Sequence, residues 1–565
     1  MPALGAAAES SAGADTRRRP SWLCSDCTAA GGTGSRGPRG ASPRRFLSLD
    51  CRSLHQLAAG IASRLEGAQS GRDPSGRQVR VGVETMRTSY SMHPRVIAGS
   101  SLLVLTLMLA GCANFSPDHG MTLVADGVGA TIQKDVVAVR TAEDADTTEA
   151  VVKRLLGRTL DVETAIQIAL LNNKGLQAAF NELALAEADS VEQSLPPNPV
   201  FSISRVSGDA AFETSRQVVG DILALATLPF RAEIARERFR AAQFRAILET
   251  LRTAAETRRA YYRAVGANEL TVVLNDTKTS AEAIAELAEK LGKTGSMNKL
   301  DQAREQVFYA EITADVASAR QEAASSRERL ARAMGLWDQK LNFKLPSRLP
   351  DLPRRPKSLP FIEVDAVAHR VDLQIARIEL GALARAQNLT EATRFVTLLD
   401  LAGIDSRTKE PEGSPFRQRG FELQFQVPIF DGGEVRVRQA TEIYNQAFNR
   451  LTERAVNVRS EARETYRNYR SLYDIAGHYQ REVLPLRKVI ADETELRYGA
   501  MQVDVFAVLA EARQRVASLR AATEAKRDFW LATADLQTAV NGGGSGDSGR
   551  EGRITTVSAV ASTPN

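Results

Sequence analysis

The chain carries one structural pattern twice, and this duplication constrains its fold more than any other feature. Each copy reads as a short helix, an alternating hairpin, a turn at a proline and a very long helix that ends at a glycine. The first copy covers residues 160–336 and the second covers 361–540. Paired strands joined to helices of this length are typical of a rod or a tube, and they argue against an enzyme built around one pocket.

The two long helices are predicted over 231–291 and 434–498. At ~1.5 Å per residue, each is roughly 90–100 Å long. Gly477 and Pro485 are the expected bends of the second helix. After each tip, small and apolar residues recur three and four positions apart, as in Leu300, Ala303, Val307 and Ala310 and in Leu509, Ala512, Val516 and Leu519. This spacing predicts a coiled-coil contact, and the short helices before and after each hairpin have the combined length to stack beside one long helix.

Two hairpins are predicted, with strands over 198–206 and 217–228 and over 394–402 and 419–430. In the last strand, Phe421, Leu423, Phe425 and Val427 share one face, while Glu422, Gln424 and Gln426 share the other. This alternation is typical of a membrane strand with its apolar face toward lipid, and equally of a half-buried strand in a soluble sheet. Four strands cannot close a barrel that spans a membrane, so a membrane role requires several copies.

A lipid-modified cysteine is predicted near the N-terminus. An apolar run over 96–110 follows Arg95, and its length of about 15 residues suits a signal peptide and is short for a membrane-spanning helix. The run ends in Leu109-Ala110-Gly111-Cys112, which resembles a bacterial lipobox. We therefore expect a lipoprotein signal peptide over 86–111, cleaved after Gly111, with diacylglycerol and palmitate chains on Cys112. The alternative is an ordinary signal peptide with an unrelated cysteine.

The remaining segments divide by composition. Residues 1–85 show no periodicity, and we interpret them as a mis-annotated or disordered leader that precedes the true start codon at Met86 or Met92. We expect a lipid-anchored N-terminal tether or extended arm over 112–158, the first repeat over 159–340, a Pro-rich linker over 341–360, the second repeat over 361–541 and a disordered tail over 542–565.

Taken together, these motifs resemble the TolC-like outer membrane efflux protein family, here in its lipoprotein form. The resemblance rests on the duplicated unit, the Val427-Pro-Ile-Phe-Asp-Gly-Gly433 turn, the Leu496-Arg-Tyr-Gly499 tip and the lipobox. It implies a mainly α fold with a small β part, in which each copy gives a long-helix tunnel segment and four strands of a trimeric 12-stranded membrane β-barrel. It also implies a homotrimer in the outer membrane of a Gram-negative bacterium, extending into the periplasm to a periplasmic adaptor protein and an inner-membrane pump.

Within this resemblance, Gly295 and Gly499 mark the periplasmic tip and gate, and Asp504 is the acid nearest the second tip. Relatives often carry paired acids on this helix, but here Ala507 and Ala510 stand at about those positions. The exported substrate is not indicated, because a tunnel imposes weak selectivity.

Other function classes find little support. The charges are nearly balanced, with 73 Lys+Arg against 68 Asp+Glu, and no basic stripe crosses the repeats, so nucleic-acid binding is not expected. The sequence shows no metal-spaced histidines and no nucleophile motif, so we expect no catalytic residue, metal or cofactor, and no enzyme. Two alternatives stay open. One is a periplasmic adaptor lipoprotein of such a pump, and the other is a lipid-tethered coiled-coil scaffold.

Overall fold

The computed structural model describes residues 115–208, 212–409 and 413–542. The chain divides into two units, Met1–Ala98 and Gly99–Asn565, and all described residues belong to the second. The predicted leader, the signal peptide, the lipid attachment at Cys112 and nearly all of the predicted tail lie outside the described residues. The predicted mainly α fold with a small β part is confirmed.

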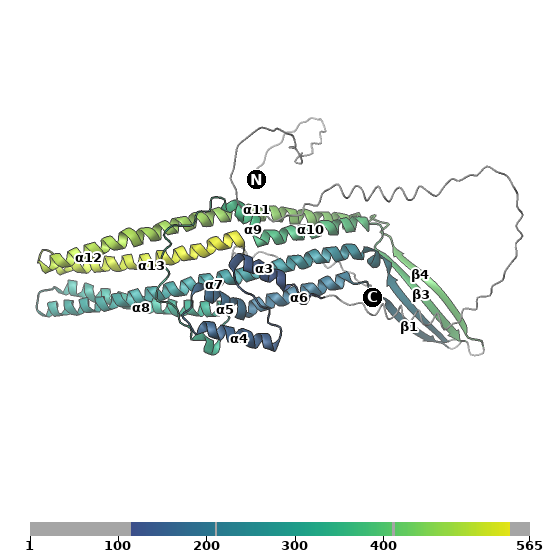
Figure 1. Cartoon of the computed structure of the whole chain (residues 1–565), viewed down its shortest axis with the longest axis horizontal. Helices are drawn as coiled ribbons and strands as arrows, with labels where there is room; N and C mark the ends of the chain where they lie inside the picture. Colours follow the sequence, from purple (N-terminus) through teal and green to yellow (C-terminus); the bar gives the residue numbers. More distant parts are fainter. Residues whose placement is uncertain (1–114, 209–211, 410–412, 543–565) are drawn as a thin grey trace, which may run out of the picture. The chain divides into compact units, whose positions relative to one another are not determined.

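The two repeats contain the same elements in the same order (Figure 1). The first has α5 (Val162–Asn172), α6 (Lys174–Ser194), β1 (Val200–Ser207), β2 (Phe212–Asp221), α7 (Ile222–Lys293) and α8 (Lys299–Ala333). The second has α9 (Ile362–His369), α10 (Val371–Ala392), β3 (Leu398–Lys409), β4 (Phe416–Gln426), α11 (Glu434–His478), η2 (Tyr479–Val483), α12 (Leu484–Gly499) and α13 (Val505–Asn541). Within this unit the strands form one sheet at one end of the helices, and the α7–α8 and α12–α13 tips lie together at the other end.

The first long helix begins earlier than predicted. The sequence predicts a strand up to residue 228 and a turn at Pro229, whereas β2 ends at Asp221 and α7 runs for 72 residues with Pro229 inside it. The Asp221 side chain caps the helix by accepting a hydrogen bond from the backbone N–H of Ala224 at 2.7 Å. The leucines and alanines of the next turns are strong helix formers, so this short apolar run, which would also suit a buried strand, forms a helix.

The second long helix bends where the sequence predicts a bend. Its axis passes from α11 through η2, a π-helical segment of five residues, into α12. Pro485 lies in the first turn of α12, where it has no N–H to donate and its ring crowds the carbonyl of the preceding turn. A wider π-helical turn relieves this crowding and is a recognised cause of a kink.

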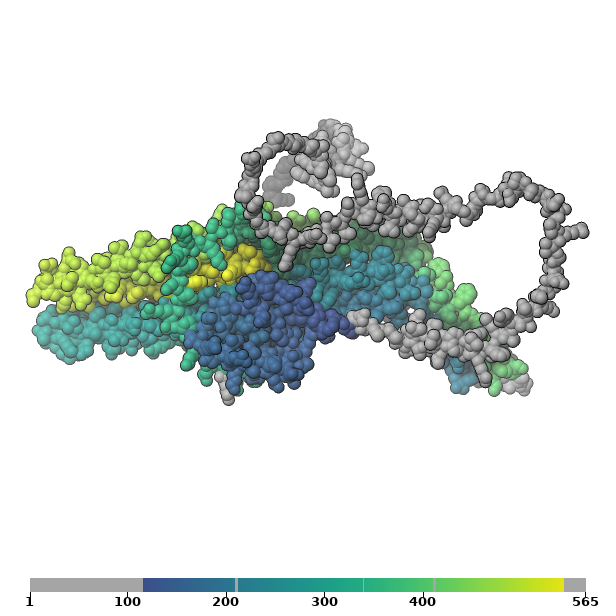
Figure 2. Space-filling view, in the orientation of Figure 1, coloured from purple at the N-terminus to yellow at the C-terminus, as the bar shows by residue number. Residues whose placement is uncertain are grey.

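The segment after the predicted lipid site is helical and not extended. It forms α3 (Met121–Ile132) and α4 (Ala142–Leu156), which Figure 2 shows as a dark blue mass over the middle of the helices. Val124 and Val128 of α3 are fully buried against residues of α6 and α7. Just before α3, the Ser116 backbone N–H donates to the buried Glu187 carboxylate of α6 at 2.7 Å. Helical periodicity and burial therefore hold this segment on the body.

A short 3₁₀ helix, η1 (Asp338–Leu341), follows α8 and leads into the linker between the repeats.

Short helices stack end to end beside α7 through a joint between α5, α6 and α8. The amide of Asn172 donates to the Met334 and Gly335 carbonyls at 3.2 and 2.6 Å, and that of Asn173 donates to the Ala333 carbonyl at 3.0 Å. These bonds satisfy carbonyls at the C-terminal end of α8, which have no partner within their own helix. The stacking that the helix lengths predict is therefore present in the first repeat.

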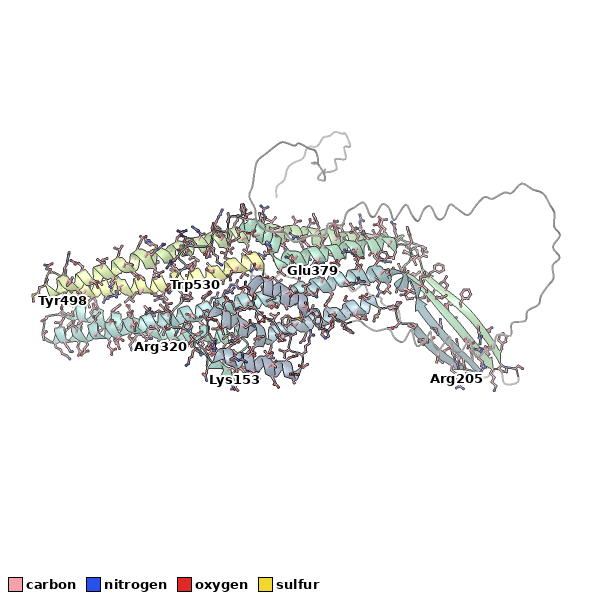
Figure 3. All side chains as sticks on the ribbon, in the orientation of Figure 1. Lys153, Arg205, Arg320, Glu379, Tyr498 and Trp530 are labelled. Atoms are coloured by element: carbon pink, nitrogen blue, oxygen red, sulfur yellow. The ribbon has the colours of Figure 1, made fainter. Side chains whose placement is uncertain are left out.

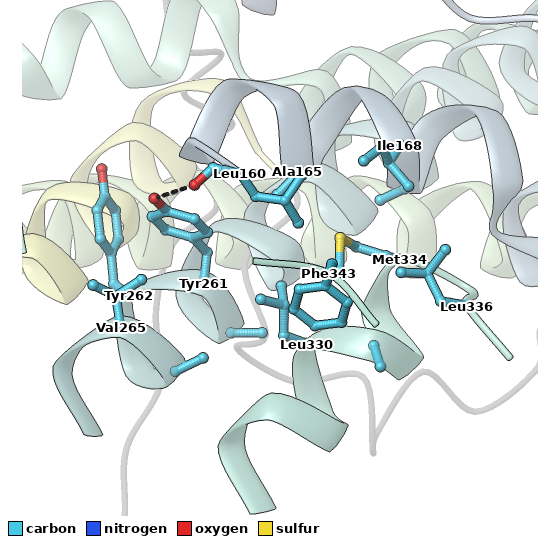
Figure 4. Packing of buried hydrophobic residues seen from close by; sticks show 14 of the residues in the cluster. Leu160, Ala165, Ile168, Tyr261, Tyr262, Val265, Leu330, Met334, Leu336 and Phe343 are labelled. Atoms are coloured by element: carbon cyan, nitrogen blue, oxygen red, sulfur yellow. Dashed lines mark hydrogen bonds between the residues drawn. The ribbon is translucent and has the colours of Figure 1, made fainter. Parts of the chain in front are cut away.

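Buried side chains of α5, α7 and α8 pack around this joint (Figure 4). The Tyr261 hydroxyl donates to the Leu160 carbonyl at 3.0 Å, and burial raises the pKa of Tyr261 well above its ordinary value, so the hydroxyl remains a donor. Leu330 and Met334 of α8 and its C-terminal turn are fully buried in the same cluster.

The second repeat has an equivalent joint built from a charged residue. Arg370 lies between α9 and α10 and is buried. It donates to Asp372 at 2.9 and 3.0 Å, to Glu461 of α11 at 2.5 Å and to the Ala539 carbonyl of α13 at 3.4 Å. Burial lowers the pKa of the Arg370 guanidinium, but the two carboxylates raise it further, so the net shift is upward. The guanidinium therefore stays charged at the end of α13.

Gly335 provides a test of the first joint. Its backbone is left-handed at φ +66, and an added Cβ would lie 2.9 Å from both the Asn172 carbonyl oxygen and the Asn173 Cα. We expect Gly335→Ala to lower the free energy of unfolding by about 2–4 kcal/mol through strain and overpacking. Gly295, at φ +73 with no atom within 4 Å of an added Cβ, is the matched control. Its alanine variant should lose only about 1–2 kcal/mol. Denaturant titration followed by circular dichroism measures both, and equal losses would contradict the packed joint.

Candidate functional site

The four strands form one antiparallel sheet whose register sorts the side chains onto two faces. The strand order is β1-β2-β3-β4, so β1 and β4 are its edges. Gly403 lies opposite both Val218 of β2 and Phe421 of β4, and Val218 lies opposite Phe201 of β1. Because successive side chains of a strand point to opposite faces, these four residues lie in one row on one face.

This face, called here the apolar face, carries large hydrophobic residues, and most of them lie toward the helices. Its hydrophobic members are Phe201, Ile203, Phe212, Val218, Leu399, Leu401, Phe421, Leu423 and Phe425. Phe421 is 82% exposed, Leu423 53% and Phe425 62%. The structure thus places three of the four residues of the predicted membrane-facing strand together on this face. The fourth, Val427, lies one residue beyond β4 and is 44% exposed.

The opposite face, called here the polar face, is dominated by hydroxyl, amide and carboxylate groups. Its polar members are Ser202, Ser204, Glu213, Ser215, Gln217, Asp221, Asp400, Ser406, Thr408, Gln418, Glu422, Gln424 and Gln426. The Ser406 hydroxyl donates to Glu213 on the neighbouring strand at 2.7 Å. The charged groups of this face are carboxylates, and none of the described arginines or lysines of the four strands lies on it. The sheet therefore separates a hydrophobic surface from a hydrophilic one.

The two helical tips have the same backbone design. In the first, Gly295 is left-handed at φ +73 and the Ser296 N–H donates to the Leu291 carbonyl at 2.9 Å. In the second, Met501 is left-handed at φ +58 and the Gln502 N–H donates to the Arg497 carbonyl at 2.9 Å. These bonds are typical of helix ends that close with a left-handed residue.

This geometry corrects the alignment of the tips. The sequence pairs Gly295 with Gly499, whereas the structural equivalent of Gly295 is Met501, and Gly499 is the last residue of α12. A methionine at positive φ gives no sequence signal, because glycine is the residue expected there. Met501 is also 94% exposed, and Figure 3 labels Tyr498, three residues earlier in the chain, at this tip.

Asp504 has a structural role at the second tip. Its side chain caps α13 by accepting a hydrogen bond from the Ala507 N–H at 3.0 Å. Asn298 does the same at the first tip, where it accepts from the Asp301 N–H at 2.9 Å. The two caps lie three residues after the two left-handed residues, so Asp504 and Asn298 are equivalent positions.

An ion pair between a buried carboxylate and a half-buried arginine, missed by the sequence analysis, joins the two tip hairpins. Glu305 of α8 is 4% exposed in its side chain, and its carboxylate lies 3.0 Å from the Arg513 guanidinium of α13. Arg513 also donates to the Arg304 carbonyl at 3.2 Å and lies over the Phe308 ring. Glu305 Oε2 and Arg513 Nε are buried without a hydrogen-bond partner. Neither residue stands out in the sequence, because both lie among many other charged residues of long helices.

Within residues 115–208, 212–409 and 413–542, no group of three His, Cys, Asp or Glu side chains is arranged to hold a metal ion. None of the helices over these residues is both long enough and apolar enough to cross a membrane.

Comparison with known proteins gives structural matches only. No family model and no curated protein matches the sequence. The structure of the CusC transmembrane channel is 20% identical and matches over 67% of this chain and 92% of that chain, with a TM-score of 0.57. The outer-membrane channel OprN is 18% identical over 72% of this chain and 97% of that chain, also at 0.57. The CmeC outer membrane channel of Campylobacter jejuni is 15% identical over 68% and 86%, at 0.57.

These likenesses define the class of fold. The chain has the fold of outer membrane channels, and it spans most of the length of each matched structure. The fold that the resemblance to TolC-like outer membrane efflux proteins implies is therefore confirmed.

Substitutions at Asp504 separate its capping role from its charge. We expect Asp504→Ala to destabilise the first turn of α13 by about 1 kcal/mol, whereas Asp504→Asn, which keeps a side-chain acceptor, should change it by only a few tenths. Hydrogen exchange of the Ala507 amide measures this local stability directly. If the asparagine variant exchanged as fast as the alanine variant, the carboxylate charge and not the cap would be the important property.

Proposed function

We propose that this chain is the outer-membrane channel component of a tripartite efflux or secretion system, assembled as a homotrimer. The observation that carries the proposal is the sheet, which has an exposed hydrophobic face, a hydrophilic face and two open edges. Each unpaired backbone group costs several kcal/mol in a bilayer, so an open four-stranded sheet cannot enter one alone. Pairing of β4 with β1 of the next copy removes both edges, and three copies give a 12-stranded barrel.

In this assembly the apolar face contacts outer membrane lipid and the polar face lines a water-filled passage. The long helices continue the passage into the periplasm, where the two tips of each copy contact a periplasmic adaptor protein and, through it, an inner-membrane pump. A signal peptide cleaved after Gly111 and acyl chains on Cys112 would anchor the segment that precedes α3. Ser116 and His119 of that segment contact the buried Glu187 carboxylate of α6.

Transport requires no chemistry from this chain. Substrate would move through the passage, and energy would come from the inner-membrane partner. The closed end would open when the α7–α8 and α12–α13 hairpins separate at the tips. Glu305 and Arg513 hold these hairpins together within one copy, so their ion pair is one contact that opening would break or rearrange.

The two alternatives receive no specific support. An adaptor would need β-rich halves on either side of one helical hairpin, whereas the β-strands of the described residues form one sheet at one end of the long helices. A soluble scaffold gives no reason for an exposed row of large hydrophobic residues on that sheet.

Single-channel conductance tests the proposal. The chain would be expressed with its own signal peptide in a Gram-negative host, purified from the outer membrane and reconstituted in a planar bilayer. Discrete conductance steps and one trimeric species on a native gel are the expected result. A monodisperse protein that is tethered to the membrane but never conducts would contradict the channel.

Neighbouring residues of β4 test which face meets lipid. We expect Leu423→Lys to reduce assembly in the membrane strongly, because a lysine facing lipid at mid-depth costs about 2–4 kcal/mol in each copy. Gln424→Lys is the matched control, since the same charge would lie on the polar face. It should assemble normally and shift ion selectivity toward anions. Heat-resistant trimer on a gel and reversal potential measure the two effects. Equal loss in both variants would contradict the assignment of the faces.

Loss of the Glu305–Arg513 ion pair should make the closed state leak. Arg513→Gln leaves Glu305 buried without its charged partner, so we expect a higher open probability in bilayers and greater sensitivity of cells to large antibiotics. Arg520→Gln is the control, because Arg520 joins the same two helices through an exposed pair with Asp315 at 3.4 Å. Unchanged leakage in the Arg513 variant, with trimer intact, would show that this tie does not hold the closed end.

A further inference from the structure

The apolar face carries a group of basic residues at the end of the sheet that lies farthest from the helices. Arg205, Arg407 and Arg417 share one row across β1, β3 and β4, as the register shows. Arg216 and Arg419 share the next row toward the helices, with Asp405 between them. These five arginines are called here the basic rows, and Figure 3 labels Arg205 near the far end of the sheet.

The positive charge of the basic rows is mostly uncompensated. Asp405 pairs with Arg417 at 2.6 Å and approaches Arg419 at 3.6 Å. Among the described residues, Arg205, Arg216 and Arg407 have no ion-pair partner, and all five arginines are exposed. Lys409 adds a further charge on the same face. The connecting loops contain Asp209, Glu410 and Glu412, which lie outside the described residues and are fewer than the basic groups.

The basic rows, which also hold Ile203 of β1, end where rows without charge begin. The next row toward the helices holds Phe201, Val218, Gly403 and Phe421 and contains no charge. The rows after it hold Gly220, Leu401 and Leu423, and then Leu399 and Phe425. The far end of the polar face, in contrast, has Glu213 and no basic residue among those described. The basic groups therefore lie at the far end of the apolar face only, and the far end of the polar face has none among the described residues.

We propose that the basic rows bind the phosphate groups of the phosphorylated glycolipid in the outer leaflet of the membrane. This inference rests on the proposed function, in which the helices extend into the periplasm and the hairpin ends face outward. Acyl chains would then cover the uncharged rows, and the arginines would stand at the height of the lipid head groups.

The chemistry of the rows suits this ligand. Arginine binds phosphate oxygens in a bidentate manner that a simple point charge does not reproduce. Along a strand the two rows are about 7 Å apart, and neighbouring strands are about 5 Å apart. A head group with more than one phosphate can therefore contact arginines of both rows at once, whereas a lipid with one phosphate contacts fewer of them.

The test compares lipid binding by two double variants of the full chain, purified in a neutral detergent. The probe is fluorescent bisphosphorylated lipid A, titrated at fixed ionic strength. We expect Arg216→Gln with Arg407→Gln to weaken binding roughly 25-fold, about fivefold for each charge removed. Neither arginine side chain has a hydrogen-bond or ion-pair partner among the described residues, and glutamine keeps the backbone pairing of the sheet, so the fold should persist. The control, Lys153→Gln with Arg154→Gln, removes the same charge from exposed positions of α4 and should bind as the wild type does.

Binding of other phosphate compounds shows whether the site prefers the glycolipid. Phosphatidylglycerol should bind more weakly than lipid A, and inorganic phosphate should displace lipid A only at far higher concentration. Equal affinity for phosphatidylglycerol would overturn the glycolipid assignment, and efficient displacement by inorganic phosphate would indicate a site for free anions. An unchanged affinity in the Arg216 and Arg407 double variant would overturn the inference outright.

Conductance in a phosphatidylcholine bilayer separates this inference from the channel itself. The double variant should conduct as the wild type does, because its arginines lie on the face away from the passage. A wild-type chain that conducts, together with a double variant that still binds lipid A normally, would contradict the lipid inference alone. A wild-type chain that binds lipid A through these arginines but never conducts would contradict the channel alone.

Discussion

The architecture depends on hydrogen bonds at the joints where the end of one helix meets the start of another. At each joint, side chains of one helix pair with backbone carbonyls of the other. The last carbonyls of a helix have no hydrogen-bond partner within that helix. The C-terminal ends of α8 and α13 are packed beside α7 and α11, away from solvent. Asn172 and Asn173 satisfy the end of α8, and Arg370 contacts the end of α13. These joints turn several short helices into two continuous columns. Each column can then follow a long helix over nearly its whole length, and this alignment places the sheet at one end and both tips at the other.

The two repeats use different chemistry for the same joint, and the difference affects their stability. The asparagine joint is compact and requires Gly335, because a Cβ at this position would lie 2.9 Å from the backbone of Asn172 and Asn173. The arginine joint instead buries the charged Arg370 beside Asp372 and Glu461. The guanidinium donates three hydrogen bonds to these carboxylates, and its burial carries a desolvation cost. Loss of one carboxylate there would leave a buried charge partly unpaired, whereas the first joint depends on shape.

The sequence predicts the periodic elements well and their ends poorly. The alternation of Phe421, Leu423 and Phe425 predicts a two-faced strand, and β4 has that form. The small-residue spacing predicts the helices after the tips, and α8 and α13 agree closely with it. The start of α7 could not be predicted, because Ile222 to Leu228 is a short apolar run that suits a buried strand, while its leucines and alanines favour a helix. Asp221, the cap that decides between the two, reads in the sequence as an interruption of a strand.

The site shows the same division between local and long-range information. A register assigns every strand residue to a face, but it depends on pairing between repeats, so the row that joins Arg205, Arg407 and Arg417 is invisible in the sequence. The same is true of Glu305 and Arg513, which are more than 200 positions apart. The pairing of Gly295 with Gly499 fails for a different reason. Met501 adopts a backbone conformation that its residue type rarely takes, so composition points to the wrong position.

Differences between the repeats indicate where the chain can move. The first repeat passes from β2 directly into the unbroken helix α7, so the sheet and the first tip are joined by one stiff rod. The second repeat passes from β4 through a turn at Gly433, then through the π-helical segment η2, before it reaches α12. None of the 16 residues of α12 is buried, whereas Leu274, Ala281 and Ala288 are buried along the corresponding part of α7. Conformational change is drawn from the least stable elements of a fold. If the tips separate, α12 and α13 should therefore move against a fixed α7 and α8, and the Glu305–Arg513 contact lies on that boundary.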